Sequence, residues 1–258
     1  MLPNKFMSRD VYASCIDQNH FIARLKDCFD WDNLACPLED MANNSTGGRP
    51  RHPVVQMLKM LFIAFLFNQS DRETEFTCTN NLLVKYFLEL PINEKSADHT
   101  CLCRFREEVL DKKGTAFFDN LFRSLIIEAK NLGVVFSVVN ALDATHTVAD
   151  VKADKPQDPK TPRDPDASWG CKGDETKTTN TGTKVRVPKF FLGYKAHLLG
   201  ETLNNIVTGF HVTPGHVADI DGGDWLIHRV LGDDERACLK VLLADKGLWI
   251  MSRLDQYA

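Results

Sequence analysis

The chain has 258 residues, of which 43% are hydrophobic, enough for one large domain or two small ones with a sizeable core. Its eight cysteines are irregularly spaced and no secretory signal is recognisable, so we expect reduced cytoplasmic thiols rather than a secreted, disulfide-bonded protein. The formal net charge of -4 argues mildly against a nucleic-acid-binding protein, although DNA binding depends on local charge.

Residues 1–132 predict an all-α domain. After a mixed segment that ends in the loop signature Asn43–Gly48, the run from Val54 to Phe67 is apolar nearly all round, as in a central helix. This run is too short to cross a bilayer and carries Lys59, so a buried helix is favoured over a membrane span.

Three more helices are expected in this region. Ser70 and Glu73 have the spacing of a helix N-terminus, and the helix would continue to about Leu90. The segment 96–98 opens a further helix, and a last one covers about 115–132. The apolar side of the helix after residue 98 holds Cys101, Leu102, Phe105 and Val109.

Residues 133–258 predict a second domain that contains a mixed sheet. The expected strands are 134–142, about 189–199, about 206–213 and 239–244. Asn204-Asn205 suits a tight hairpin turn, and spacing from Val217 to Leu231 favours a helix. The polar stretch from about 150 to 188 is interpreted as a long, partly ordered insertion. The order of elements predicts an α+β or α/β chain with helices against a mixed sheet.

Two carboxylates close expected buried strands. Asp143 ends the run that begins at Val134, and Asp245 ends the run that begins at Leu239. A carboxylate at such a position costs free energy unless it is hydrogen-bonded, paired or bound to a metal. Two of them on neighbouring strands would make half of a divalent-metal site for phosphoryl transfer. The alternative is that each aspartate only ends its strand in a turn.

Basic residues form two groups of candidate DNA contacts. Six lie between Cys171 and Gly200, opposed by two acids; the six are Lys172, Lys177, Lys184, Arg186, Lys189 and Lys195. They fit either a solvated loop or a surface for phosphates. Arg104 and Arg106 fit either a solvated helix face or phosphate contacts from a helix-turn-helix-like domain.

Four other polar residues have structural interpretations of equal or greater weight. His146 is expected in a turn, and Asp219 at the start of a helix. Tyr194 and His197 fit packing within a strand as well as they fit a functional site.

Several motifs together resemble bacterial insertion-sequence transposases of the DDE type, in the insertion-sequence five family and its relatives. The matching segments are 49–53, 96–106, 142–145, 163–170, 191–197, 212–219 and 244–247. Their order along the chain carries the resemblance, because each segment alone is a weak signal.

The resemblance implies an N-terminal DNA-binding domain and an RNase H-like catalytic domain. Asp143 and Asp245 would be the first two of three acids that bind Mg²⁺ or Mn²⁺. The protein would cut and join DNA at terminal inverted repeats, as a homodimer or higher oligomer on DNA, in the cytoplasm and without a membrane.

The third acid of this family, usually a glutamate on a helix well past the second aspartate, has no counterpart here. Asp255 comes too early to take its place. We therefore expect an incomplete catalytic domain, from a fragment, a truncated gene or a frameshifted product. The alternative function is an inactive DNA-binding protein that inhibits a full-length transposase, and a weaker one is another metal-dependent nuclease of this fold.

Overall fold

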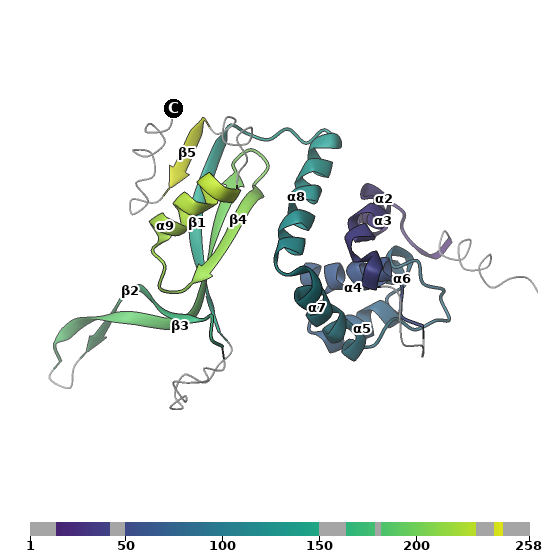
Figure 1. The fold of residues 1–258 in the computed structure, drawn as a ribbon, viewed down its shortest axis with the longest axis horizontal. Coiled ribbons are helices and arrows are strands. Elements are labelled where there is room, and N and C mark those ends of the chain that lie inside the picture. The colour runs from purple at the N-terminus through teal and green to yellow at the C-terminus, as the bar shows by residue number, and fades with distance from the viewer. Residues whose placement is uncertain (1–13, 42–49, 150–163, 179–181, 231–239, 245–258) are drawn as a thin grey trace, which may run out of the picture. The chain divides into compact units, whose positions relative to one another are not determined.

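A computed structural model describes residues 14–41, 50–149, 164–178, 182–230 and 240–244. The fold is α+β, with a helical N-terminal part followed by a sheet region, as the sequence predicted (Figure 1). The chain divides into two compact units between Leu132 and Gly133.

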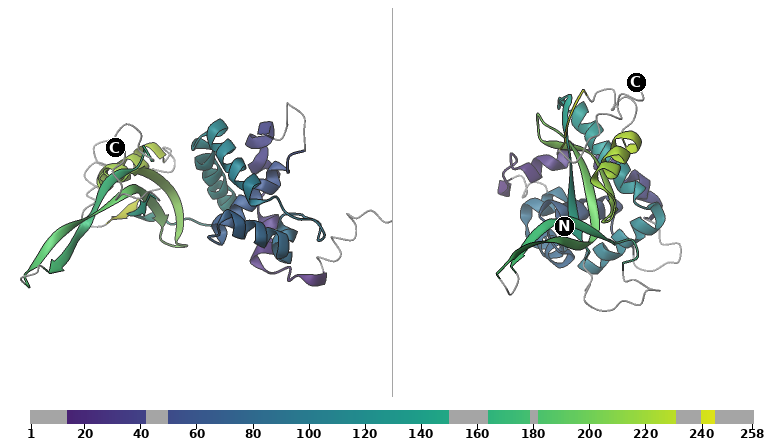
Figure 2. Two further views of the ribbon diagram at one scale, coloured as in Figure 1. Left: turned by 90° about the horizontal axis from the view of Figure 1, so that it is seen from below. Right: turned by 90° about the vertical axis from the view of Figure 1, so that its left-hand side faces the viewer.

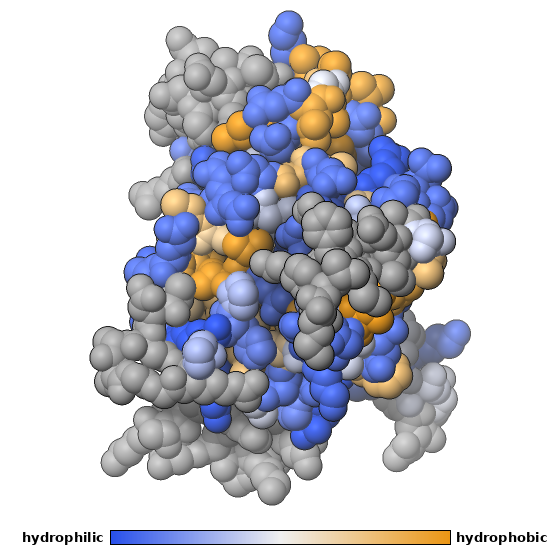
Figure 3. Space-filling view, turned by 90° about the vertical axis from the view of Figure 1, so that its right-hand side faces the viewer, coloured by the Kyte–Doolittle hydropathy of each residue, from blue (hydrophilic) through white to orange (hydrophobic). Residues whose placement is uncertain are grey.

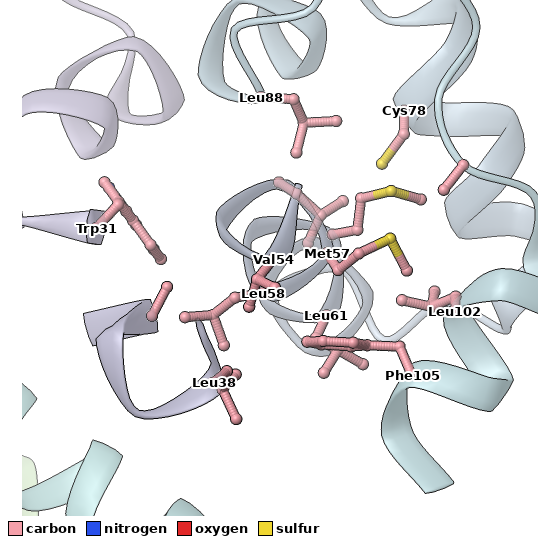
Figure 4. Close-up of a cluster of buried hydrophobic side chains, with 14 of the residues drawn as sticks. Trp31, Leu38, Val54, Met57, Leu58, Leu61, Cys78, Leu88, Leu102 and Phe105 are labelled. Atoms are coloured by element: carbon pink, nitrogen blue, oxygen red, sulfur yellow. The ribbon is translucent and has the colours of Figure 1, made fainter. Parts of the chain in front are cut away.

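The helical unit is built around α4 (Val54–Leu66), the predicted central helix. The other elements of this unit are α2 (Phe21–Cys28), α3 (Trp31–Ala35), a 3-10 turn η1 (Cys36–Met41), α5 (Asp71–Asn80), α6 (Leu82–Phe87), α7 (His99–Lys113) and α8 (Ala116–Asn131). Side chains from α3, α4, α5 and α7 meet in one buried cluster, part of which is drawn in Figure 4. Leu102, Phe105 and Val109 of α7 are buried in it, which confirms the predicted apolar side.

Helix ends in this unit follow the expected capping chemistry. The Glu73 backbone N–H donates to Ser70 Oγ at 3.4 Å, and Glu73 Oε2 accepts from the Ser70 backbone N–H at 2.8 Å. The predicted single helix through Leu90 is wrong, because Asn81 is extended and interrupts it. The Asn81 side chain accepts from the N–H groups of Leu83 and Val84, so it starts α6 as a new helix.

The charge on α4 is buried and paired. Lys59 Nζ lies 3.1 Å from Glu89 Oε2. It also lies over two aromatic rings, 5.7 Å from the centroid of Trp31 and 5.4 Å from the centroid of Phe87. Burial raises the pKa of Glu89, but the ion pairs with Lys59 and Lys26 together outweigh it and hold that pKa below its usual value. The lysine therefore belongs to the core, as expected of a buried helix.

The second unit is a mixed sheet with one helix on a face. Its strands are β1 (Val139–Val148), β2 (Ser168–Thr178), β3 (Lys184–Glu201), β4 (Ile206–Pro214) and β5 (Val241–Ala244). Their order is β2-β3-β1-β5, with β4 also paired to β3; β1 and β5 are parallel, and the other pairs are antiparallel. The predicted hairpin turn is confirmed, since Asn205 has φ +56° between β3 and β4.

The predicted end of the first strand is wrong. Because β3 supplies backbone partners as far as Val148↔Gly193, β1 continues through Asp143 for five more residues. His146 consequently lies within a strand and not in the predicted turn.

The predicted insertion at about 150–188 is only partly correct. Residues 168–178 form β2, and β3 already begins at Lys184, because these two stretches pair as an antiparallel hairpin that ends at Thr178↔Lys184. Residues 150–163 lie outside the part that the structure describes.

The helix predicted from Val217 appears as α9 (Asp219–Trp225), which continues as a π-helical turn, η2 (Leu226–Val230). Leu226 and Ile227 pack against Leu142 and Leu199 to form the core of this unit. Gly222 permits the close approach of α9, because a Cβ at that position would overlap the ring of His197.

Candidate functional site

Asp143 projects from the face of the sheet that α9 does not cover, which we call the open face. Side chains alternate along a strand, and Leu142 points into the core beside α9, so Asp143 points to the opposite face. It is exposed, and its Oδ1 accepts a hydrogen bond from the backbone N–H of Ala144 at 2.8 Å. The carboxylate is therefore accessible to a ligand and avoids the burial cost that a strand-end position had suggested.

The parallel pair β1 and β5 relates the two candidate acids. In this ladder Leu142 lies opposite Ala244. These are the residues that directly precede Asp143 and Asp245 in the sequence. Asp245 itself lies outside the described residues.

A row of polar groups continues along β1 from Asp143. Thr145 and Thr147 share its face and are exposed, and Thr147 lies opposite Tyr194 of β3. The Tyr194 hydroxyl donates to Asp164 Oδ1 at 2.6 Å. That hydrogen bond, followed by burial, raises the pKa of Tyr194 to about 12, so the phenol stays protonated and acts as a donor. Asp164 was not singled out from the sequence, since nothing local marks a partner thirty residues away.

Asp143 gives this face an oxygen ligand of the kind that Mg²⁺ prefers. Mg²⁺ is usually held by one or two carboxylates together with waters and substrate phosphates, and Asp143 provides one accessible carboxylate. Within the segments that the structure covers, no three His, Cys, Asp or Glu side chains are grouped to hold a metal.

The two candidate arginines of α7 have different environments. Arg104 is exposed. Arg106 forms an ion pair with Asp71 of α5 and thereby joins two helices. The structure thus leaves Arg104 open to solvent and gives Arg106 a partner inside the helical unit.

The candidate basic residues of β3 have three environments, two on the faces of the β2–β3 hairpin and one, that of Lys195, beside α9. Lys184 and Arg186 are exposed and share one face of the β2–β3 hairpin, since they are two residues apart. Lys189 is exposed on the other face, where it helps Lys177 to lower the pKa of Glu175.

Lys195 is held at the helix α9. Its side chain is 14% exposed, and its Nζ lies 2.8 Å from Asp219 Oδ1 and donates to the Val217 carbonyl at 2.8 Å. Asp219 is the first residue of α9, close to the expected helix start. Lys195 and Asp219 therefore position α9 on the sheet.

His146 and His197 lie on the opposite face of the same strands from Asp143. His197 is buried, its Nε2 lies 3.0 Å from Thr213 Oγ1, and burial lowers its pKa. His146 lies between the Phe191 ring, at 4.9 Å, and Lys172 Nζ, at 3.3 Å. His197 consequently has a packing role, which agrees with the structural interpretation of its strand.

Comparison with known proteins relates the helical unit to a family. Residues 10–108 match a family model described as "Transposase domain (DUF772)". This match supports a transposase-related role, and hence a role on DNA, for the chain. No curated protein and no solved structure matches it. In the part of the chain that is described, no helix is both long and apolar enough to span a membrane.

Proposed function

We propose that the chain works as a DDE-type transposase related to the insertion-sequence five family, cutting and joining DNA at the terminal inverted repeats of its own element. Two observations support this. Residues 10–108 match a transposase domain. The sheet order β4-β3-β1-β5, with α9 packed on one face, agrees with the RNase H-like domain that the resemblance implies.

The observation that carries the proposal is the parallel register of β1 and β5. Leu142 lies opposite Ala244, so the same register continued by one residue would set Asp143 beside Asp245 on the open face. Two carboxylates from neighbouring strands would then be close together although a hundred residues of chain separate them. That is the arrangement that two-metal phosphoryl transfer requires of its first two acids.

In the proposed reaction Asp143 and Asp245 hold Mg²⁺ or Mn²⁺, which neutralises charge on the phosphate under attack. Asp143 is accessible, so DNA phosphates and waters can complete the ligand set. The exposed Lys184, Arg186 and Lys189, together with Arg104, bind phosphates outside the reacting centre and hold the strand in place. The family's third acid has no counterpart in this sequence, so the proposal assigns only the first two acids to named residues. The protein acts as a dimer or higher oligomer on DNA.

An excision assay tests the reaction. The locus that encodes this chain, with the DNA that follows it, is supplied to cells that carry a marker flanked by the terminal repeats. Asp143→Asn and Asp245→Asn should each abolish excision, whereas Asp111→Asn, at an exposed position of α7, should leave it intact. Excision that survives Asp143→Asn would refute the assigned role.

Metal binding can be measured without activity. Fe²⁺ in place of Mg²⁺, with ascorbate and peroxide, cuts a polypeptide next to the metal. Cuts are expected at residues near 143 and 245, and excess Mg²⁺ or Asp143→Asn should suppress them. Cleavage elsewhere would separate the metal from these acids.

A second candidate is an inactive DNA-binding protein that inhibits a full-length transposase. The observation that favours it is that the family match lies wholly in the helical unit, which has its own buried core. Gel shifts with terminal-repeat DNA and with random DNA of equal length measure specific binding, and incubation of the same DNA with Mg²⁺ measures cleavage. Specific binding without metal-dependent cleavage fits only this candidate.

A further inference from the structure

The hairpin of β2 and β3 extends beyond the rest of the sheet. β1 pairs with β3 from Gly193 onward and β4 from Tyr194 onward, so β2 is the only ladder partner of residues 184–192 among the described strands. Figures 1 and 2 show this part of β2 and β3 as an arm that leaves the sheet. We call residues 168–178 and 184–192 the arm.

One face of the arm combines aromatic and basic side chains. Trp169 lies opposite Leu192, and Phe190 lies opposite Cys171, so Trp169 and Phe190 are diagonal neighbours on one face, about 7–8 Å apart. The register shift between Cys171 and Asp174 adds its extra residue to β2, so β3 keeps its alternation, and Arg186 and Lys184 follow Phe190 on the same face. The exposed Asp174, opposite Pro188, is also on this face, so two cations stand against one acid.

The aromatic side chains of this face are open to solvent. Trp169 is 56% exposed and Phe190 62% exposed. On the other face, Phe191 is buried and packs on the His146 ring, and further out Lys177 and Glu175 form an ion pair of 2.6 Å. The second face therefore has internal partners, whereas Trp169 and Phe190 offer their rings outward.

We propose that the aromatic and basic face of the arm binds an unpaired DNA strand. Trp169 and Phe190 stack on bases, and Lys184 and Arg186 bind the phosphates of the same strand. A duplex offers base edges and backbone to a protein, whereas an unpaired strand offers base faces, which exposed aromatic rings accept whatever the sequence. This inference rests on the proposed DNA role and assigns unpaired DNA to the arm.

Fluorescence anisotropy of the whole chain with labelled oligothymidylate, and with a mixed-sequence duplex of equal length, tests this assignment. Trp169→Ala and Phe190→Ala should each weaken oligothymidylate binding by roughly five-fold to a hundred-fold, and duplex binding much less. Trp169→Phe and Phe190→Tyr should restore most of the affinity, because they keep a ring that can stack. Val185→Ala, on the opposite face of the arm, is the matched control and should leave both affinities unchanged.

Three results would overturn the proposal. Unchanged oligothymidylate affinity in both alanine variants would remove the aromatic rings from binding. An equal loss on single-stranded and duplex DNA would make the arm a general phosphate surface. A change of oligomeric state in light scattering, without a change in DNA affinity, would make this face a contact between two copies of the chain.

The same assay separates this inference from the proposed strand chemistry. Excision reports on Asp143, and oligothymidylate binding reports on the arm, because Asp143 does not lie on the arm. If excision does not need Asp143 while both alanine variants lose oligothymidylate, the proposed chemistry fails and the arm assignment stands. If excision needs Asp143 and the arm variants bind normally, the reverse holds.

Discussion

The helical unit and the sheet unit are stabilised in different ways. Among the described residues, the helical unit has 21 buried residues in one apolar cluster, whereas the sheet unit has four. The sheet unit depends instead on backbone ladders and on polar contacts such as Lys195–Asp219 and His197–Thr213. Because hydrogen-bonded ladders hold the sheet unit together, one sheet face and the arm can stay exposed to a ligand. The helical unit instead uses its apolar surfaces to form its core.

Glu201 shows how the sheet unit uses a buried charge. Burial raises the pKa of its carboxylate, but backbone N–H groups of Ser137, Asn204 and Leu203 donate to it and hold that pKa below its usual value. The carboxylate thereby fixes the β3–β4 turn to the residues that precede β1.

Exposed apolar residues occur in both units. Phe65 and Phe76 of the helical unit are 72% and 70% exposed. On the face drawn in Figure 3, hydrophobic groups are separated by hydrophilic residues. On the arm, two exposed rings share one face of a hairpin with two cations.

The largest effect is expected in the core of the helical unit. Phe87 is fully buried, with the Trp31 ring 5.1 Å away, so Phe87→Ala should lower the free energy of unfolding by about 3–5 kcal/mol. Urea unfolding followed by circular dichroism measures this. Phe76→Ala is the exposed control and should stay within about 0.5 kcal/mol. Similar losses for both variants would contradict the picture of a single dense core.

The arm should affect DNA binding and not stability. Replacing Lys184, Arg186 and Lys189 with Ala should weaken binding to all DNA roughly ten-fold or more, and should lower the slope of log affinity against log salt by about 0.9 for each lost phosphate contact. Anisotropy titrations over a range of salt concentrations measure both.

The matched comparison for the arm is Lys195→Met. Because Lys195 already pairs with Asp219, this change should destabilise the sheet unit and leave the salt slope unaltered. A slope that responds to Lys195 and ignores the arm would reverse the assignment of the two basic groups.

Packing in the sheet unit should show at Gly222. Gly222→Ala places a methyl group in the His197 ring and should cost about 1–3 kcal/mol. In a His197→Ala background the same change should cost much less, because the ring is gone, and a double-mutant cycle gives the coupling. Equal costs in both backgrounds would mean that α9 does not rest on His197.

The smallest effect concerns the start of α7. Asp98 Oδ1 accepts hydrogen bonds from the Thr100 hydroxyl and from the Cys101 backbone N–H, the latter at 2.8 Å. The Thr100 bond, followed by the Cys101 bond, lowers the pKa of Asp98 from 3.8 to about 2. A depressed folded-state pKa stabilises the protein above pH 3.8, and this contribution is lost as the pH falls towards 2.

Substitutions at Asp98 separate the cap from its charge. Asp98→Ala should cost about 0.5–2 kcal/mol at neutral pH. Asp98→Asn keeps an acceptor that does not titrate, so it should flatten the pH dependence of unfolding over this interval. An unchanged pH profile in Asp98→Asn would assign the acid sensitivity to other carboxylates.

The sequence by itself predicted the later part of the helical unit, from α4 to α8, because its signals are local. For α2, α3 and η1 it predicted no helix. The apolar run of α4, the Ser70–Glu73 cap and the apolar side of α7 each depend on residues within a few positions of one another. It also gave the α+β order and the β3–β4 turn at Asn205. The one error from α4 to α8, a single helix from 70 to 90, arose because the Asn81 cap outweighed a continuous helical pattern.

Only the tertiary structure decided where strands end and which side chains share a face. Polar residues after Leu142 suggested that β1 stops, yet it continues because β3 offers backbone partners through Val148. The pairing of β2 with β3, the internal partner of Lys195 and the shared face of Trp169 and Phe190 all join residues distant in the sequence. Strand register is set by the partner strand, and a sequence read along one chain contains no direct measure of it.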